Sequence, residues 1–246
     1  PRAMLVDDGL ELGGTLRLLD PDASARCLDA ARRAGATIMT RTTAAGIYPG
    51  PAEREGHFTV LLAGEDGARA VFARAVLLAS GVHDAPPDFP GNDLPGVLSV
   101  RAGLSLLEGG VLPDARTVLA GSGPLLDRAA ALLGERAVER LDRDAIIRVE
   151  GRLRLRHVVA RHAGGERRIR AGALLYGAPG HPATELAVQA GGTVRYEPAL
   201  GYALHLNPES RAAANVWCAG SVTGAADSAE HGRAIAQRIA HSLEPT

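Results

Sequence analysis

The stretch "LLASGVHDAPPDFPGNDLPGV", residues 77–97, restricts the fold of this chain more than any other segment. It begins as an apolar strand, ends that strand at Ala79, Ser80 and Gly81, and then runs through four prolines. Because proline lacks a backbone N–H and has a fixed φ, this part can continue neither a helix nor a central strand. Small residues at a strand end leave room for a ligand or for a tight crossing between domains. The stretch therefore predicts an α/β sheet strand followed by a stiff connection.

The length and composition indicate a soluble globular protein. A chain of 246 residues forms one large domain or two smaller ones, and we expect two. No apolar run approaches the ~18 residues of a membrane-spanning helix. The net charge is −1 and the basic residues, all arginines, are scattered, so we expect neither nucleic acid nor membrane as a partner. The absence of lysine excludes a lysine Schiff base.

The cysteine pattern argues against a dithiol or zinc centre. Cys27 and Cys218 lie far apart, and the sequence has no C-x-x-C and no metal-ligand spacing. We therefore expect no metal site and a reduced, cytoplasmic setting.

Apolar periodicity predicts alternating strands and helices. The expected strands are residues 3–8, 36–43, two in the region 57–79, three in a meander between 145 and 176, and one within 215–224 that ends in small residues. The expected helices are 21–34, 98–108 and 226–243. The strand ends "LLASG" and "WCAGS" resemble each other, which suggests a shared environment.

The motif "GSGPLL", residues 121–126, predicts a turn between a strand and a helix. It supplies Gly121 and Gly123 as the first two glycines of G-x-G-x-x-G, with Asp142 about 20 residues further on. Leu126 replaces the third glycine, so we expect poorer packing between helix and strand. Binding of a nicotinamide dinucleotide and a fold element without a ligand both remain open.

Acid/base chemistry has weak candidates. His83 and Asp84 are adjacent on an extended segment, so their side chains point opposite ways and more simply face solvent. His231, in an expected turn, more simply fills space. Ser122 and Ser221 lie outside any G-x-S-x-G motif, which argues against a hydrolase. We therefore assign no catalytic residue.

Several of these stretches resemble one family of flavoproteins. "VLLASGVHDAPPDFPGNDLPGV" is similar to the "ATG-x-x-x-x-P-x-x-FPG-x-D-x-PGV" segment of flavoproteins with two dinucleotide-binding domains. "LVDDGLELGGTLR", "TRTTAAGIY" and "PALGYALHLNPESRAAANVWCAGSVTGAADSAEHGRAIA" resemble further family segments, in the right order. The narrower resemblance is to alpha subunits of heteromeric sarcosine oxidases, opine or hydroxyproline dehydrogenases and hydrogen cyanide synthase.

The resemblance implies an α/β fold with two Rossmann-like FAD/NAD(P)-binding domains, the second inserted into the first. The FAD-type domain would comprise residues 1–97 and 200–246, and the NAD-type domain residues 98–199. Family members open with a βα unit that carries G-x-G-x-x-G, whereas this sequence begins at the second strand. Loss of that unit would expose strand edges, so we expect a sequence that lacks its natural start rather than a protein that lost the unit.

The resemblance also implies a site for FAD, or for NAD in the same groove. A carboxylate at the end of a second strand can accept both ribose hydroxyls, although Asp7 can equally be a solvated turn acid. The start of the last helix would offer free amides to a pyrophosphate or a flavin, although it can also be an ordinary capped helix. The predicted cofactor-binding residues are Asp7, Gly13, Gly14, Thr43, Ala79, Ser80, Gly81, Gly121, Gly123, Gly220, Ser221, Glu230 and Gly232.

One substitution weakens the resemblance at the expected cofactor site. The family usually has Ala-Gly-Asp where this chain has Ala219-Gly220-Ser221, and serine lacks the charge-assisted bond of a carboxylate.

The function that the resemblance implies is that of an alpha-type subunit. Such a subunit relays electrons from a small-molecule amine substrate, together with a beta-type flavoprotein subunit in a hetero-oligomer. The alternatives are a non-catalytic scaffold that has lost the cofactor and a stand-alone NAD(P)H reductase.

Overall fold

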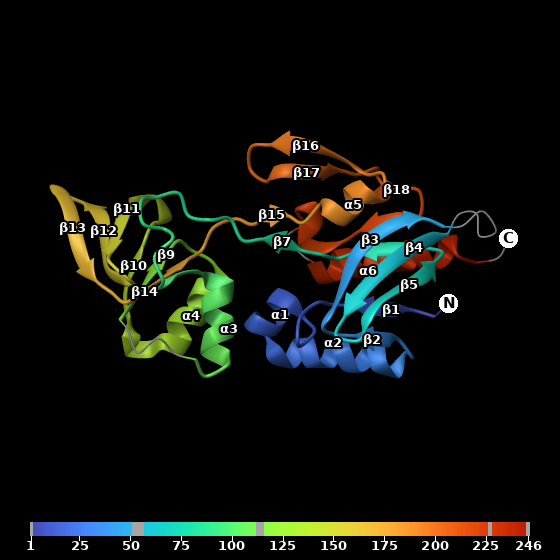
Figure 1. Cartoon of the computed structure of the whole chain (residues 1–246), viewed down its shortest axis with the longest axis horizontal. Coiled ribbons are helices and arrows are strands. Elements are labelled where there is room, and N and C mark those ends of the chain that lie inside the picture. The colour runs from blue at the N-terminus through green and yellow to red at the C-terminus, as the bar shows by residue number, and fades with distance from the viewer. Residues whose placement is uncertain (1, 51–56, 112–115, 226–227, 245–246) are drawn as a thin grey trace. The chain divides into compact units, whose positions relative to one another are not determined.

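The computed structural model describes residues 2–50, 57–111, 116–225 and 228–244, and it confirms the expected α/β class (Figure 1). The chain divides into two compact units. Unit 1 comprises Pro1–Gly14, Ser24–His83 and Gly180–Thr246, and unit 2 comprises Thr15–Ala23 and Asp84–Pro179. No helix in the described residues is long and apolar enough to cross a membrane.

Unit 2 is built on a parallel sheet in the order β10-β9-β14-β8. Its strands are β8 (Val97–Ser99), β9 (Thr117–Ala120), β10 (Ala137–Leu141) and β14 (Ala173–Tyr176). Its helices are α1 (Gly14–Leu19), α3 (Val100–Glu108), α4 (Pro124–Leu133), η2 (Gly134–Arg136) and η3 (Arg143–Ala145). An antiparallel meander follows, made of β11 (Ile146–Gly151), β12 (Leu155–His162) and β13 (Gly165–Arg170).

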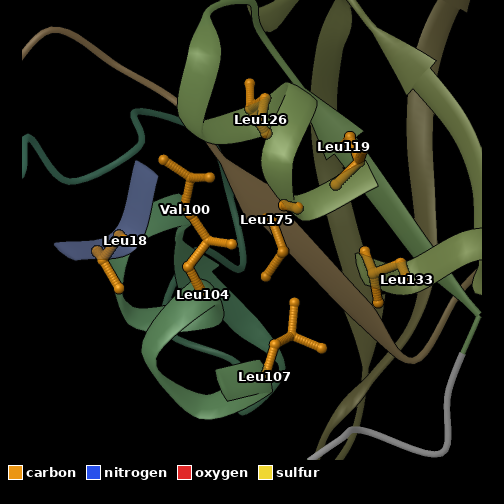
Figure 2. Packing of buried hydrophobic residues seen from close by; sticks show 9 residues of the cluster. Leu18, Val100, Leu104, Leu107, Leu119, Leu126, Leu133 and Leu175 are labelled. Carbon is orange, nitrogen blue, oxygen red and sulfur yellow. The ribbon is translucent and has the colours of Figure 1, made fainter. Parts of the chain in front are cut away.

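The sheet of unit 2 is covered on both faces. On one face Leu104 of α3 and Leu126 of α4 pack with Leu119 and Leu175 of the sheet, and Leu18 of α1 joins them (Figure 2). On the other face residues of the meander pack against Val118, Ala120 and Leu174. Burial on both faces explains why β9 reads as a continuous apolar run.

The start of unit 2 differs from the sequence expectation, which placed the boundary at residue 97. The backbone carbonyl of Pro90 accepts from the Val149 amide at 3.0 Å, and that of Pro95 accepts from Leu155 at 2.9 Å. These bonds fasten the proline-rich stretch to the meander, so the long segment of unit 2 begins at Asp84. The helix expected over residues 98–108 is wrong in its first turn, because Leu98 pairs with Leu175 in the sheet.

Unit 1 contains several short sheets. Its strands are β1 (Met4–Val6), β2 (Thr37–Met39), β3 (Thr42–Pro49), β4 (Phe58–Gly64), β5 (Gly67–Ala73), β6 (Val76–Leu78), β7 (Val82–His83), β15 (His181–Pro182), β16 (Thr193–Glu197), β17 (Gly201–His205), β18 (Arg211–Ala213) and β19 (Val216–Cys218). Its helices are α2 (Pro21–Arg33), α5 (Glu185–Gln189), η4 (Gly220–Thr223) and α6 (Ser228–Ser242).

The core of unit 1 has β6 and β19 at its centre. These strands are parallel neighbours, and β1 pairs in parallel with β2. Cys218 faces the antiparallel sheet β3-β4-β5 together with Ile47 and Leu62, whereas Trp217 faces Ile235 of α6. The alternation of side chains along a strand thus sends neighbouring residues of β19 into two separate clusters.

The single strand expected over residues 36–43 is wrong, because the chain breaks it into β2 and β3. Arg41, between them, has φ 48, in the left-handed region that a residue with a side chain seldom adopts. Its amide donates to the Gly9 carbonyl at 2.9 Å, which ties this turn to the loop after β1.

Candidate functional site

The ends of β6 and β19 lie side by side in unit 1, which brings the two similar sequence segments together. Leu78 is paired with Cys218, and the Ala219 amide donates to the Leu78 carbonyl at 3.0 Å. A Cβ added to Gly81 would lie 3.7 Å from Ser221 Oγ. The structure therefore places Gly81 and Ser221 at one sheet edge, where ligands bind in open α/β sheets.

The segment Ala79–Gly81 is held by the chain that returns from unit 2. Ser80 Oγ donates to the Ala183 carbonyl at 2.9 Å, and the Ala183 amide donates to the Gly81 carbonyl at 3.1 Å. The hydroxyl group of Ser80 thus donates its proton to a backbone carbonyl in this structure. Gly81 has φ 75, a conformation that strains any residue with a Cβ.

In the loop after β19, both backbone polar groups of Gly220 form hydrogen bonds. The Gly220 amide donates to His231 Nδ1 at 3.3 Å, and the Gly220 carbonyl accepts from Thr223 Oγ1 at 2.8 Å. His231 lies inside α6, so the turn expected around it is wrong. A role for His231 in fixing this loop was not foreseen from the sequence.

Asp7 follows β1 and closes a turn. Its Oδ1 accepts from the Gly9 amide at 2.8 Å, and its carbonyl accepts from the Thr42 amide at 3.0 Å. The turn-acid interpretation thus has a direct contact in its favour. Thr43 was singled out in the sequence, but its side chain is exposed and it is the neighbouring Thr42 that bonds to Asp7.

The remaining predicted residues of unit 1 occupy open positions. Gly13 and Gly14 have φ 113 and 48, and a Cβ on Gly14 would meet nothing within 4 Å. Helix α6 begins at Ser228, within the range expected for the last helix, with Glu230 exposed in its first turn. Gly232 follows with nothing within 4 Å of its Cβ position. Glu230 and Gly232 lie on α6, which contacts η4, the turn that follows β19.

Gly121 and Gly123 belong to unit 2 and form a separate turn between β9 and α4. Their φ values are 107 and 113, and a Cβ on Gly121 would lie 2.6 Å from the Gly177 carbonyl. Arg140 Nε donates to the Gly121 carbonyl at 3.1 Å, and its guanidinium pairs with Asp127. This pair lies against the turn that would receive a pyrophosphate.

The expectation that Leu126 compromises the packing of this turn is wrong. Leu126 is fully buried, and the facing strand end supplies the missing space, because Gly177 has no side chain. A Cβ on Gly177 would lie 2.6 Å from Leu126 Cδ1. The absent glycine of the motif is thus replaced by a glycine elsewhere in the fold.

The titratable groups offer little acid or base chemistry. His83 Nε2 lies 3.0 Å from Glu185 Oε1 in unit 1, and Asp84 pairs with Arg101 at 2.7 Å in unit 2. Burial raises the pKa of the Cys218 thiol to about 11, so it stays protonated near neutral pH. The described residues contain no cluster of three or more His, Cys, Asp or Glu that could hold a metal ion.

Comparison with solved structures gives the fold. L-proline dehydrogenase from P. horikoshii matches with a TM-score of 0.72 at 22% identity, over 90% of this chain and 46% of that one. T. acidophilum thioredoxin reductase matches with a TM-score of 0.71 at 15% identity, over 99% and 91%. An FAD-dependent pyridine nucleotide-disulphide oxidoreductase from Desulfovibrio vulgaris matches with a TM-score of 0.63 at 17% identity, over 98% and 71%.

The chain has the α/β fold of FAD/NAD(P)-binding oxidoreductases. In sequence it is 42% identical over 76 residues to the HcnB subunit of hydrogen cyanide synthase from Pseudomonas protegens, and 40% identical over 72 residues to an opine oxidase subunit from Agrobacterium tumefaciens. These matches cover 30% and 29% of this chain but only 16% and 14% of the relatives. No family model matches the sequence.

Proposed function

We propose that this chain is the dinucleotide-binding part of an FAD-dependent oxidoreductase, in which unit 1 holds FAD, or NAD in the same groove. The parallel pairing of β6 and β19 carries the proposal, because it sets Gly81 3.7 Å, measured from its Cβ position, from Ser221 Oγ. Each strand is followed by three residues no larger than serine. Small residues at such a strand edge would let a dinucleotide approach the backbone closely.

Each residue of this edge would have a modest task. The carboxylate of Asp7 would accept from a ribose hydroxyl. Gly13 and Gly14 would let the backbone approach the phosphates, and Gly81 would do so on the adenosine side. Ser221 would offer one uncharged hydrogen bond at the far end. When bound, FAD supplies the hydride acceptor that none of these side chains can replace.

The cysteines argue against a disulphide reductase, in spite of the shared fold. Cys27 is exposed on α2, and Cys218 is buried in β19 with its pKa raised to about 11. They lie on different elements of unit 1, and both are free. A disulphide reductase needs a pair of thiols that can form a bond, so we propose oxidation of a small amine instead.

A partner subunit is part of the proposal. The HcnB protein of hydrogen cyanide synthase and the opine oxidase relative are both named as subunits of larger enzymes. We therefore propose an alpha-type subunit that relays electrons beside a beta-type flavoprotein subunit. Unit 2, with its parallel sheet and the Gly121–Gly123 turn, would be an NAD-type domain of the same subunit.

The test compares glycine variants of the full-length protein. Gly81→Ala adds a methyl group at the proposed cofactor edge, and Gly35→Ala is a matched control, because Gly35 has φ 77 and nothing within 4 Å of its Cβ position. Both variants bear the same backbone strain. We expect Gly81→Ala to weaken FAD binding by about tenfold or more through crowding, and Gly35→Ala to leave it unchanged.

Other outcomes identify the alternatives. Purified wild-type protein should show the visible absorbance of a flavin or take up FAD in a calorimetric titration. A colourless protein that binds no dinucleotide would instead support the scaffold function. Turnover of NAD(P)H with a dye acceptor and without partners would support a stand-alone reductase.

A further inference from the structure

His231 connects three segments at the end of β19. Its Nδ1 lies 3.3 Å from the Gly220 amide and 3.4 Å from Thr223 Oγ1, and its Nε2 lies 3.3 Å from Ser210 Oγ. The imidazole is half-buried in α6, between the loop before β18 and η4. It therefore links the helix to both sides of the strand.

The hydrogen bonds determine which ring nitrogen carries the proton. A backbone amide can only donate, so Nδ1 must be the acceptor in the bond from Gly220. The Thr223 hydroxyl already donates to the Gly220 carbonyl at 2.8 Å, so its proton is not directed at Nδ1. The neutral ring then carries its proton on Nε2 and donates it to Ser210 Oγ.

We propose that His231 is a positioning residue, which holds the Gly220–Ser221 loop in its dinucleotide-binding form only while its ring is neutral. A protonated imidazole has two donors and no acceptor, so it cannot bond to the Gly220 amide. That amide would then turn away or lose its partner, and Ser221, the next residue, would move with it. This inference rests on the proposed function only for its effect on dinucleotide binding.

Other ionisable groups lie on the elements around His231. Glu209 and Arg211 flank Ser210 and pair at 3.1 Å, while η4 itself carries no ionisable side chain. On α6 the charged residues of the first half are Glu230 and Arg233, with Arg238 beyond them. The strands β15 and β17 also contact η4 and carry His181 and His205.

Trp217 is a natural reporter of this arrangement, because it is the one tryptophan of the chain. It is fully buried and packs against Ile235, one helical turn after His231. The guanidinium of Arg211, the neighbour of Ser210, lies 4.7 Å from its ring centroid. Two of the three segments that His231 connects, α6 and the segment of Ser210 and Arg211, thus contact Trp217, so a movement of either should change its fluorescence.

The experiment measures Trp217 fluorescence of the full-length protein without added dinucleotide, from about pH 8 to about pH 5, where histidines take up a proton. We expect a reversible change in the wild type. His231→Asn keeps an acceptor for the Gly220 amide but cannot become charged, so its signal should stay flat. His205→Asn, a control on an exposed histidine of β17, should respond as the wild type does.

Binding of FAD gives a second measurement. The wild type should bind FAD about fivefold or more weakly at the acid end, the loss expected for one hydrogen bond, while the asparagine variant should bind equally at both ends. His231→Leu should bind weakly at both. A wild-type fluorescence signal without pH dependence, or one that His231→Asn retains, would overturn the inference.

The two proposals fail separately. If the wild type binds no dinucleotide at any pH, the proposed function fails, and the fluorescence comparison still decides the role of His231. If FAD binds with an affinity that neither pH nor His231→Leu alters, the proposed function stands and the positioning role is refuted.

Discussion

Replacing Gly177 by alanine should destabilise unit 2 through a single contact. The added Cβ would lie 2.6 Å from Leu126 Cδ1 and 3.2 Å from Leu126 Cγ, whereas ordinary contacts between such atoms begin at 3.4 Å. Leu126 is fully buried among leucines of α3 and the sheet, so it has little room to withdraw. Gly177 does not have the positive φ that would strain alanine, so the whole cost is steric. Overpacking of this kind costs about 1–3 kcal/mol.

A double substitution isolates that contact. Leu126→Ala alone should cost about 2–5 kcal/mol, because it leaves a cavity between α4 and the sheet. In the double variant the methyl group of residue 177 meets no leucine and partly fills that cavity. The double variant should therefore be more stable than the sum of the two single costs predicts, by about 1–3 kcal/mol.

Urea unfolding followed by circular dichroism measures these differences, provided that the slopes of the transitions are unchanged. The reasoning is refuted if Gly177→Ala unfolds at the same urea concentration as the wild type. It is equally refuted if the two single costs simply add, because the proposed complementarity would then carry no energy.

Further predictions concern unit 1. Gly232→Ala should raise the free energy of unfolding by about 0.5–1 kcal/mol in urea titrations, since Gly232 lies inside α6 with nothing within 4 Å of its Cβ position. Trp217→Ala should cost about 3–5 kcal/mol, whereas Trp217→Phe should cost much less, because the buried indole Nε1 has no hydrogen-bond partner among the described residues. A thiol reagent at about pH 8 should label Cys27 quickly and Cys218 only on unfolding, because burial raises the pKa of Cys218 to about 11 and keeps it protonated below that value. Mass spectrometry of the labelled chain would read out both sites, and early labelling of Cys218 would contradict the prediction.

The parts of the fold that the sequence predicts are those with a local signature. The segments "LLASG" and "WCAGS" both end in small residues, and the structure pairs their strands in parallel, so that both strands finish at the same edge. The meander is likewise predicted by its glycine turns, although it ends at Arg170, and residues 173–176, expected to belong to it, form β14 of the parallel sheet. Each of these features depends on residues that are neighbours in the chain.

The features that were missed depend on contacts between distant residues. The backbone carbonyls of Pro90 and Pro95 accept hydrogen bonds from the meander. Every residue has such a carbonyl, so the residue types do not indicate which one is bonded. The sequence motif alone suggested that Leu126 is too large for its position. The glycine that makes room for it, Gly177, follows β14 and lies far away in the chain. His231 meets a backbone amide of a loop, so no residue type could have signalled its partner.

The candidate edge of unit 1 should respond to added volume more strongly than to lost side chains. The groups at the centre of this edge carry no charge, and their hydrogen bonds involve the backbone. Ser80 Oγ donates to the Ala183 carbonyl, and Gly220 is bonded at both its amide and its carbonyl. Ser221→Ala removes one neutral hydrogen bond, which should weaken FAD binding by about fivefold. Gly81→Ala adds only a methyl group but places it at the ligand, so its effect should be the larger one. If Ser221→Ala weakens binding far more than Gly81→Ala, the site recognises its ligand through a side chain rather than through the shape of an open backbone.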